Sequence, residues 1–410
     1  MIATQQPARV SAAVEEELSL LGTLSLYLHI PFCHAKCHYC DFNSYAGQLR
    51  WREPYVEALL REIAWAGELA RGSGAAGRPV DQPWPCRTIF FGGGTPSLLT
   101  AEQVAQTLGA ARQAFVVQTD AEITLEANPG TLEEPYLLAL RAAGVNRLSM
   151  GAQSFDAGLL RWMGRIHGPE EIERAFSLAR RAGFDNINLD FIFGLPDQSL
   201  EQWETTLARA LALAPDHLSL YALIVEEGTP LHRWVDQGRV RPADEDVTAE
   251  MYLLAQRRLA EAGYRQYEIS NWARPGKACQ HNLTYWRNLP YLGVGAGAHS
   301  SFAGRRFSTA LKVSEYIQRI QSDGQAVVGS EEISPDLEMA ETAMLALRLN
   351  VGLSEHLFER RFGARFEEVF GARLAPVEAA GLLERADGMV RLSEQGRLLG
   401  NEVFLRLLPE

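Results

Sequence analysis

"YLHIPFCHAKCHYCDFNSY", residues 27–45, holds three of the chain's five cysteines, Cys33, Cys37 and Cys40, within eight positions. The run that leads into it, "LSLYLHI" at 24–30, is rich in leucine, aromatic and β-branched residues and predicts a strand. Thiolates are soft ligands for transition metals and iron-sulfur clusters. The stretch therefore predicts a metal or cluster site on a loop that follows a strand.

The pattern of a strand followed by a helix repeats along the first half of the chain. Six strands in alternation with helices predict parallel pairing with crossover helices, an α/β fold built as a partial (β/α)6, TIM-like barrel. Function on such a scaffold gathers at the carboxyl ends of the strands. The predicted strands are 24–30, 87–95, 122–129, 147–154, 186–196 and 217–225, with helices at 53–71, from Thr100, and at 132–143, 169–182 and 199–213.

The alternation weakens near Trp234, which divides the chain into parts. We expect an N-terminal lead at 1–23, the barrel at 24–235, a barrel-completing segment at 236–330 and a C-terminal α+β, winged-helix-like domain at 331–410. In that last part the pattern predicts helices at 335–348, 354–361 and 373–380 and a hairpin around Asp387 and Gly388. The segment "RADGMVRLSEQGR" is not strongly basic, so a structural role for this domain is favoured over DNA binding.

Composition excludes several classes of protein. The chain has 410 residues, 47% of them hydrophobic and 22% charged, as in a globular protein. With 51 Asp and Glu against 39 Lys and Arg, the net charge of -12 repels a phosphate backbone and argues against nucleic acid as a partner. No apolar run is long enough to span a membrane and no signal peptide is evident, so we expect a cytoplasmic protein. An odd number of clustered cysteines favours ligands over disulfides, leaving Cys86 and Cys279 outside the cluster.

The number of clustered cysteines separates two kinds of metal site. Structural zinc normally has four protein ligands, and His34 or His38 could complete a Cys3His zinc site. An iron-sulfur cluster held by three thiolates instead leaves one iron open to a small molecule. Both alternatives follow from the spacing alone.

The spacing C-x3-C-x2-C after "YLHIPF", together with "GGGTP" at 92–96, resembles the radical S-adenosylmethionine (SAM) superfamily. The resemblance implies a 4Fe-4S cluster on Cys33, Cys37 and Cys40, with SAM bound to the open iron. It narrows to the branch of the oxygen-independent coproporphyrinogen III oxidases (HemN) and the heme chaperones (HemW), and covers about residues 24–405.

The resemblance also implies a set of cofactor-binding residues. Taken singly, these residues have structural alternatives: hydrogen bonding in the barrel core for Gln153 and Asp190, an ion pair for Arg165 and a strand-end cap for Glu126. Their order at successive strand ends favours a common site. The implied SAM contacts are Tyr27, Tyr39, Gly93, Gly94, Thr95, Glu126, Gln153, Arg165 and Asp190, with His299 near the same pocket.

Three features depart from the oxidases and match the heme chaperones. The oxidase motif continues to a fourth cysteine, where this chain has Phe42; the lead before Tyr27 is short; and "HNLTYW" at 281–286 resembles the HNxxYW motif of the chaperones. An imidazole can bind heme iron and aromatic rings can pack on a porphyrin. The heme candidates are therefore His281, Tyr285 and Trp286, with Cys279 as an alternative iron ligand and a hydrogen-bonded aromatic cluster as the alternative for His281.

The resemblance thus implies a heme chaperone that binds a 4Fe-4S cluster, SAM and heme and passes heme to an acceptor protein, such as a membrane respiratory complex. We expect a monomer or a dimer that is not itself a membrane protein. The alternative is the oxidase, which uses SAM cleavage to decarboxylate propionate side chains; Phe42 argues against it. A zinc-loop barrel with a nucleic-acid-binding domain fits the acidic charge poorly.

Overall fold

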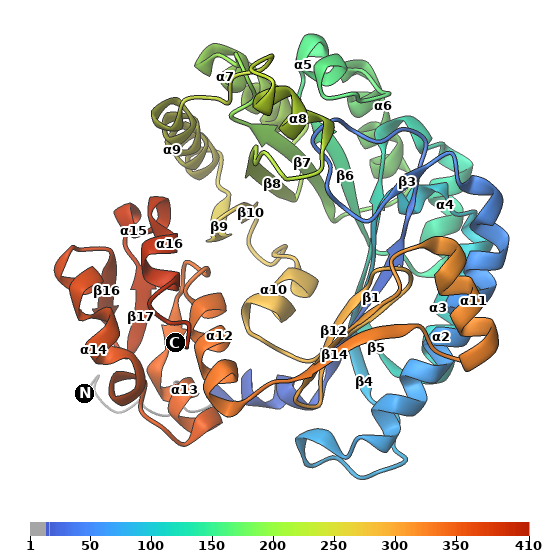
Figure 1. Cartoon of the computed structure of the whole chain (residues 1–410). Helices are drawn as coiled ribbons and strands as arrows, with labels where there is room; N and C mark the ends of the chain where they lie inside the picture. Colours follow the sequence, from blue (N-terminus) through green and yellow to red (C-terminus); the bar gives the residue numbers. More distant parts are fainter. Residues whose placement is uncertain (1–13, 16, 410) are drawn as a thin grey trace, which may run out of the picture.

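The computed structural model describes residues 14, 15 and 17–409, and it shows a curved twelve-stranded sheet with a smaller C-terminal domain (Figure 1). The strand order is β14-β13-β12-β11-β1-β4-β5-β6-β7-β8-β10-β9. Six parallel strands in chain order form its centre, so the predicted α/β class with a partial barrel is confirmed. They are β1 (Leu24–Ile30), β4 (Pro85–Gly93), β5 (Val116–Ala127), β6 (Arg147–Gln153), β7 (Ile187–Phe193) and β8 (His217–Ala222).

Helices cover the outer face of these strands (Figure 1). A capping box is present at Thr100, because the Gln103 amide donates to Thr100 Oγ1 at 3.1 Å and the Thr100 amide donates to Gln103 Oε1 at 3.0 Å. Gly144 and Gly183, with φ of 112° and 86°, end two helices in the left-handed region. The helices are α2 (Arg52–Gly72), α3 (Ala101–Ala114), α4 (Glu134–Ala143), α5 (Ala157–Trp162), α6 (Pro169–Arg181) and α7 (Leu200–Ala212).

The segment after the parallel strands supplies both edges of the sheet. On one side β11 (Tyr291–Val294) pairs in parallel with β1, and three antiparallel strands follow outward. On the other side β10 (Asn271–Ala273) runs antiparallel to β8 and β9. The remaining elements here are β9 (Arg265–Glu268), β12 (His299–Phe302), β13 (Arg305–Thr309), β14 (Val327–Glu332), α8 (Pro230–Asp236), α9 (Glu245–Glu261), α10 (Gln280–Trp286) and α11 (Val313–Asp323).

The C-terminal part has its own core and a three-stranded sheet in the order β15-β17-β16. The predicted hairpin is present, with Asp387 and Gly388 both at positive φ. The predicted helix at 373–380 is too short, because Phe366 and Phe370 recur at helical spacing and pack into the core. The elements are α12 (Pro335–Ala346), β15 (Leu353–Ser354), α13 (Glu355–Phe362), α14 (Phe366–Ala379), β16 (Leu383–Ala386), β17 (Met389–Leu392), α15 (Glu394–Leu398) and α16 (Gly400–Phe404).

Candidate functional site

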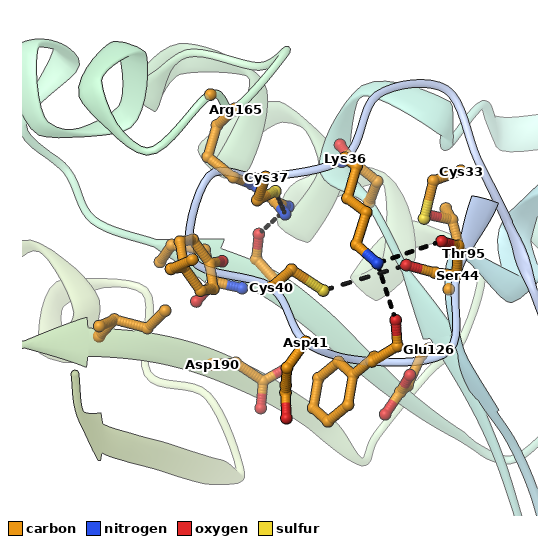
Figure 2. Close-up of a pocket in the computed structure, with 18 of the residues that line it drawn as sticks. Cys33, Lys36, Cys37, Cys40, Asp41, Ser44, Thr95, Glu126, Arg165 and Asp190 are labelled. Atoms are coloured by element: carbon orange, nitrogen blue, oxygen red, sulfur yellow. Dashed lines mark hydrogen bonds between the residues drawn. The ribbon is translucent and has the colours of Figure 1, made fainter. Parts of the chain in front are cut away.

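A cavity of about 370 Å³ lies where the carboxyl ends of the parallel strands meet the cysteine loop (Figure 2). The loop is closed at its base by two short parallel strands, β2 (Phe32–Cys33) and β3 (Tyr45–Ala46). The cavity brings together most of the residues that the sequence predicts for a cluster and SAM. Those that line it are Cys33, Cys37, Tyr39, Cys40, Gly93, Gly94, Thr95, Glu126, Gln153, Arg165 and Asp190.

The three thiols are free and sit among hydrogen-bond donors. Arg165 Nη1 donates to Cys37 Sγ at 3.4 Å, while its Nη2 donates to the Gly151 carbonyl at 2.9 Å. Thr95 Oγ1 lies 3.5 Å from Cys33 Sγ. A guanidinium and a hydroxyl directed at sulfur stabilise the thiolate form, which is the form that binds a metal.

Main-chain contacts fix the conformation of the loop. Lys36 Nζ donates to the carbonyls of Phe42 and Ser44 at 3.1 and 3.3 Å. Asn43 Nδ2 donates to the carbonyls of Ala296 and Leu311 at 2.8 and 3.0 Å, which ties the loop to the far edge of the sheet. The sequence analysis missed Lys36 and Asn43. Their partners are main-chain carbonyls, which every residue has, so no residue type in the sequence indicates these contacts.

Tyr27 lies beside the cavity and not in its lining. Its hydroxyl donates to His29 Nδ1 at 3.2 Å, and His29 Nε2 donates to the Asn43 carbonyl at 2.8 Å. Gly93 has φ of 108°, and a Cβ there would lie 2.5 Å from His29 Cε1. The packing of His29 is therefore enough to require glycine at position 93 of "GGGTP", apart from any close approach of a ligand to the backbone there.

Two half-buried carboxyl groups, Glu126 on β5 and Asp190 on β7, line the cavity. Glu126 Oε2 accepts from the Gly93 amide at 3.2 Å, and burial together with the charge of Asp190 raises the pKa of Glu126 to about 8. Asp190 accepts from Ser149 Oγ at 3.1 Å and from Asn188 Nδ2 at 2.7 Å, and burial raises its pKa as well. A cationic ligand would return these groups to the ionised state, so the pair suits the positive groups of SAM.

Gln153 is held in a strained backbone conformation. Its φ is 66°, in the left-handed region that a non-glycine residue rarely adopts, and it falls at a register shift between β6 and β7. The bulge exposes the Gly151 carbonyl that Arg165 binds. Strain of this kind concentrates at functional sites, which supports the grouping of Gln153 with the cavity.

Comparison with known proteins agrees with this geometry. Residues 27–210 match the Radical SAM superfamily and residues 333–399 match the HemN C-terminal domain. The chain is 38% identical over 387 residues to the heme chaperone HemW of Bacillus subtilis, covering 94% of this chain and 99% of the relative. It is 38% identical to HemW of Escherichia coli, covering 95% and 99%. The chain belongs to the HemW family of radical SAM proteins.

The solved structure of coproporphyrinogen III oxidase (HemN) from Escherichia coli matches with a TM-score of 0.80 at 25% identity, covering 96% of this chain and 93% of the oxidase chain. The radical SAM fold with its C-terminal domain is thus shared with HemN. Phe42, which stands where the oxidase motif has a fourth cysteine, is 64% exposed and lines the cavity.

Within this HemW-family chain, the residues of "HNLTYW" lie on α10, away from the cavity lining. His281 is 1% exposed, and its Nδ1 and Nε2 lie 2.7 Å from Thr88 Oγ1 and 2.9 Å from the Tyr285 hydroxyl. Burial lowers the pKa of His281 to about 3. Trp286 packs under the guanidinium of Arg348, at 4.6 Å from the ring centroid. In this arrangement no ring nitrogen of His281 is open to heme iron.

The other heme and SAM candidates outside the cavity lining are Cys279 and His299. Cys279 is fully buried, its thiol donates to Glu122 Oε1 at 3.4 Å, and burial raises its pKa to about 12. His299 opens β12 as an exposed side chain; burial lowers the pKa of His29, and the charge of nearby His299 lowers it further. Neither residue lines the cavity.

The donor set favours a cluster over a single ion. Within residues 14, 15 and 17–409, no three His, Cys, Asp or Glu side chains converge closely enough to hold one metal ion. His38, a candidate for the fourth ligand of a zinc site, donates from Nδ1 to the Trp162 carbonyl at 2.7 Å and packs edge-on against Trp234. Three thiols spread around one open cavity fit a larger group with a free coordination position.

Proposed function

We propose that the chain is a heme chaperone that binds a 4Fe-4S cluster, SAM and heme and transfers the heme to an acceptor protein. The observation that carries this proposal is the convergence of three thiols, Arg165 and the strand-end residues on one cavity, in a chain whose relatives are named heme chaperone HemW. The proposed place of action is the cytoplasm, and among the described helices none is long and apolar enough to cross a membrane. A membrane respiratory complex is one class of acceptor.

The cluster would be held by Cys33, Cys37 and Cys40. When bound, it supplies an iron that is open to the amino and carboxylate groups of SAM. Gly94 lacks a side chain where a Cβ would lie 2.7 Å from the Phe32 carbonyl, so the edge of β4 stays close to the loop and leaves room for the ligand. Glu126 and Asp190 would hold positive groups of SAM, and Arg165 would hold Cys37 as a thiolate.

Heme would contact the rim of the same cavity. Three exposed apolar side chains, Phe42, Ile166 and Ile224, line it at exposures of 64%, 51% and 66%. Large apolar groups that face water beside a cavity favour a flat apolar ligand. Heme would reach His281, Tyr285 and Trp286 only if α10 left its contacts with the sheet. We therefore propose the rim of the cavity, and not α10, as the heme site.

The second candidate function is oxygen-independent coproporphyrinogen III oxidase, which the structural match to HemN favours. Both functions use the same cavity. Phe42 weighs against the oxidase, since it replaces a thiol of the oxidase motif with an exposed apolar ring.

One anaerobic experiment separates the two. The cluster-reconstituted protein is incubated with SAM, a reductant and coproporphyrinogen III, and the products are chromatographed for protoporphyrinogen and 5'-deoxyadenosine. In parallel the protein is titrated with heme and followed by its Soret band. Stoichiometric heme binding without decarboxylated porphyrin supports the chaperone; protoporphyrinogen formed over many turnovers would show an oxidase.

A further inference from the structure

The helix that carries "HNLTYW" is held at both ends. At its start, the Glu122 carboxylate on β5 accepts from the amides of Gln280 and His281 at 3.1 and 3.0 Å. Just past its end, Asn288 Nδ2 donates to Thr342 Oγ1 of the C-terminal domain at 2.9 Å, and Arg361 donates to the Asn288 carbonyl at 3.0 Å. The helix therefore joins the sheet to the C-terminal domain, and Figure 1 shows α10 between the two. These contacts at both ends give His281 a fixed position.

The imidazole of His281 is also fixed in orientation. Thr88 Oγ1 and the Tyr285 hydroxyl lie at hydrogen-bonding distance from its two ring nitrogens. Its face stacks on Phe90 of β4, with ring centroids 4.9 Å apart and planes at 26°. A buried ring with two hydrogen bonds and a stacked neighbour cannot turn without losing all three contacts.

A line of contacts runs from this ring to the cysteine loop. Phe90 stacks in turn on Tyr27, at 6.2 Å and 22°. Tyr27 donates to His29, and His29 donates to the carbonyl of Asn43. Asn43 is the third residue after Cys40 and ties the loop to Ala296 and Leu311. Each step is a direct contact between named side chains or a main-chain carbonyl.

We propose that His281 is a positioning residue for the cluster loop and not the ligand of heme iron. It fixes the planes of Phe90 and Tyr27, which orient His29 so that Nε2 holds the chain just after the third cysteine. The inference rests on the proposed function only in so far as the chain binds a cluster and SAM. It assigns to "HNLTYW" a role in shaping the cluster site from nearer the amino ends of the strands, on the face of the sheet that also carries Glu126.

The test compares Thr88→Ala, Tyr285→Phe and His281→Asn in the heme-free, cluster-loaded protein. Thr88→Ala and Tyr285→Phe each remove one hydrogen bond to the His281 ring, and His281→Asn removes the ring itself. None of the three changes a cysteine. Thr88→Ser is the conservative variant, because it keeps the hydroxyl. The matched control is Thr107→Ala, since Thr107 is also fully buried but donates only to the Gln103 carbonyl within α3. The readouts are iron content, the EPR spectrum of the reduced cluster with and without SAM, SAM affinity, and the Soret band on heme addition.

We expect the three variants to keep heme binding, to alter the EPR spectrum and to weaken SAM binding about fivefold, the factor for one lost hydrogen bond. Thr88→Ser and Thr107→Ala should match the wild type. Wild-type EPR spectra and SAM affinity in all three variants would overturn the proposal, as would loss of the heme Soret band in His281→Asn with an unchanged cluster spectrum. A wild-type protein that takes up no cluster would instead overturn the proposed function, and this role with it.

Discussion

Arg165 directs its guanidinium at the sulfur of Cys37, at 3.4 Å, although 128 positions separate the two residues in sequence. The same guanidinium binds the Gly151 carbonyl at the β6 bulge. One side chain thus connects the cysteine loop to the strand end that carries Gln153. Since a guanidinium is always charged, it places a permanent positive charge beside the proposed cluster.

Replacing Arg165 should change the reduction potential of the cluster. Arg165→Ala removes a cation that stabilises the added electron, so we expect reduction at a more negative potential in an EPR-monitored redox titration. Arg165→Lys keeps the charge and should shift the potential less. Arg174→Ala, which removes an exposed arginine paired with Glu133, is the matched control. An equal potential in Arg165→Ala and the wild type would contradict the assignment.

The cysteines should separate into two groups by iron content. Single alanine variants of Cys33, Cys37 and Cys40 should lose the cluster, because each thiolate is a ligand in the proposed site. Cys86→Ala and Cys279→Ala should retain it, since both thiols are buried away from the cavity. Iron and sulfide analysis after anaerobic reconstitution measures this, and full iron loading in Cys40→Ala would exclude the three-thiol site.

Gly93→Ala should destabilise the protein through two separable causes. The positive φ strains any residue with a Cβ, and the Cβ would overlap the His29 ring; together these cost about 2–4 kcal/mol of the free energy of unfolding. Gly183→Ala is the control for strain alone, because φ is 86° and no atom lies within 4 Å of the added carbon; we expect a loss of about 1 kcal/mol.

A double variant tests the overlap directly. His29→Ala removes the ring that the added carbon would meet, so Gly93→Ala should cost less in that background than in the wild type. Urea unfolding of the four proteins gives the coupling energy. Strict additivity would show that the overlap with His29 makes no contribution.

The features that depend on local sequence patterns could be predicted. The alternation of apolar runs with helices predicted the six parallel strands, and the spacing of the cysteines predicted a ligand-binding loop after the first of them. The sheet edges were not predicted, because β11 pairs with β1 across more than 250 positions and strands of three to six residues have weak patterns of their own. For the same reason "HNLTYW" did not reveal the partners of its side chains: Thr88 and Phe90 belong to a strand almost 200 positions earlier.

Stability should depend on pH through Glu62 on α2. Glu62 is fully buried and accepts from the Gly295 amide and the Tyr316 hydroxyl at 2.7 and 2.6 Å; burial raises its pKa from 4.5 to about 7. The folded chain therefore holds this proton more tightly than the unfolded chain. The stabilisation is fully present below pH 4.5 and is lost as the pH rises through about 7.

Glu62→Gln removes this titration. Relative to the variant, the wild type should lose at most about 3 kcal/mol of the free energy of unfolding between pH 4.5 and 8. Glu57→Gln, an exposed position on the same helix, is the control and should leave the wild-type pH profile unchanged. Parallel profiles for Glu62→Gln and the wild type in urea unfolding would refute a raised pKa at Glu62.

The exposed rim of the cavity should contribute to heme affinity. If heme lies against Phe42 and Ile224, each side chain loses contact with water on binding, and truncation of a large apolar side chain that becomes buried costs about 1.5–3 kcal/mol. We therefore expect Phe42→Ala and Ile224→Ala to weaken heme binding by about tenfold or more in a Soret titration. Leu405→Ala, which truncates a 67% exposed leucine outside the cavity lining, should bind heme as the wild type does. Neither rim residue contacts the cysteines through a hydrogen bond of its side chain, so the cluster spectrum should stay unchanged in both variants. An unaltered heme affinity in both variants would place the heme elsewhere on the chain.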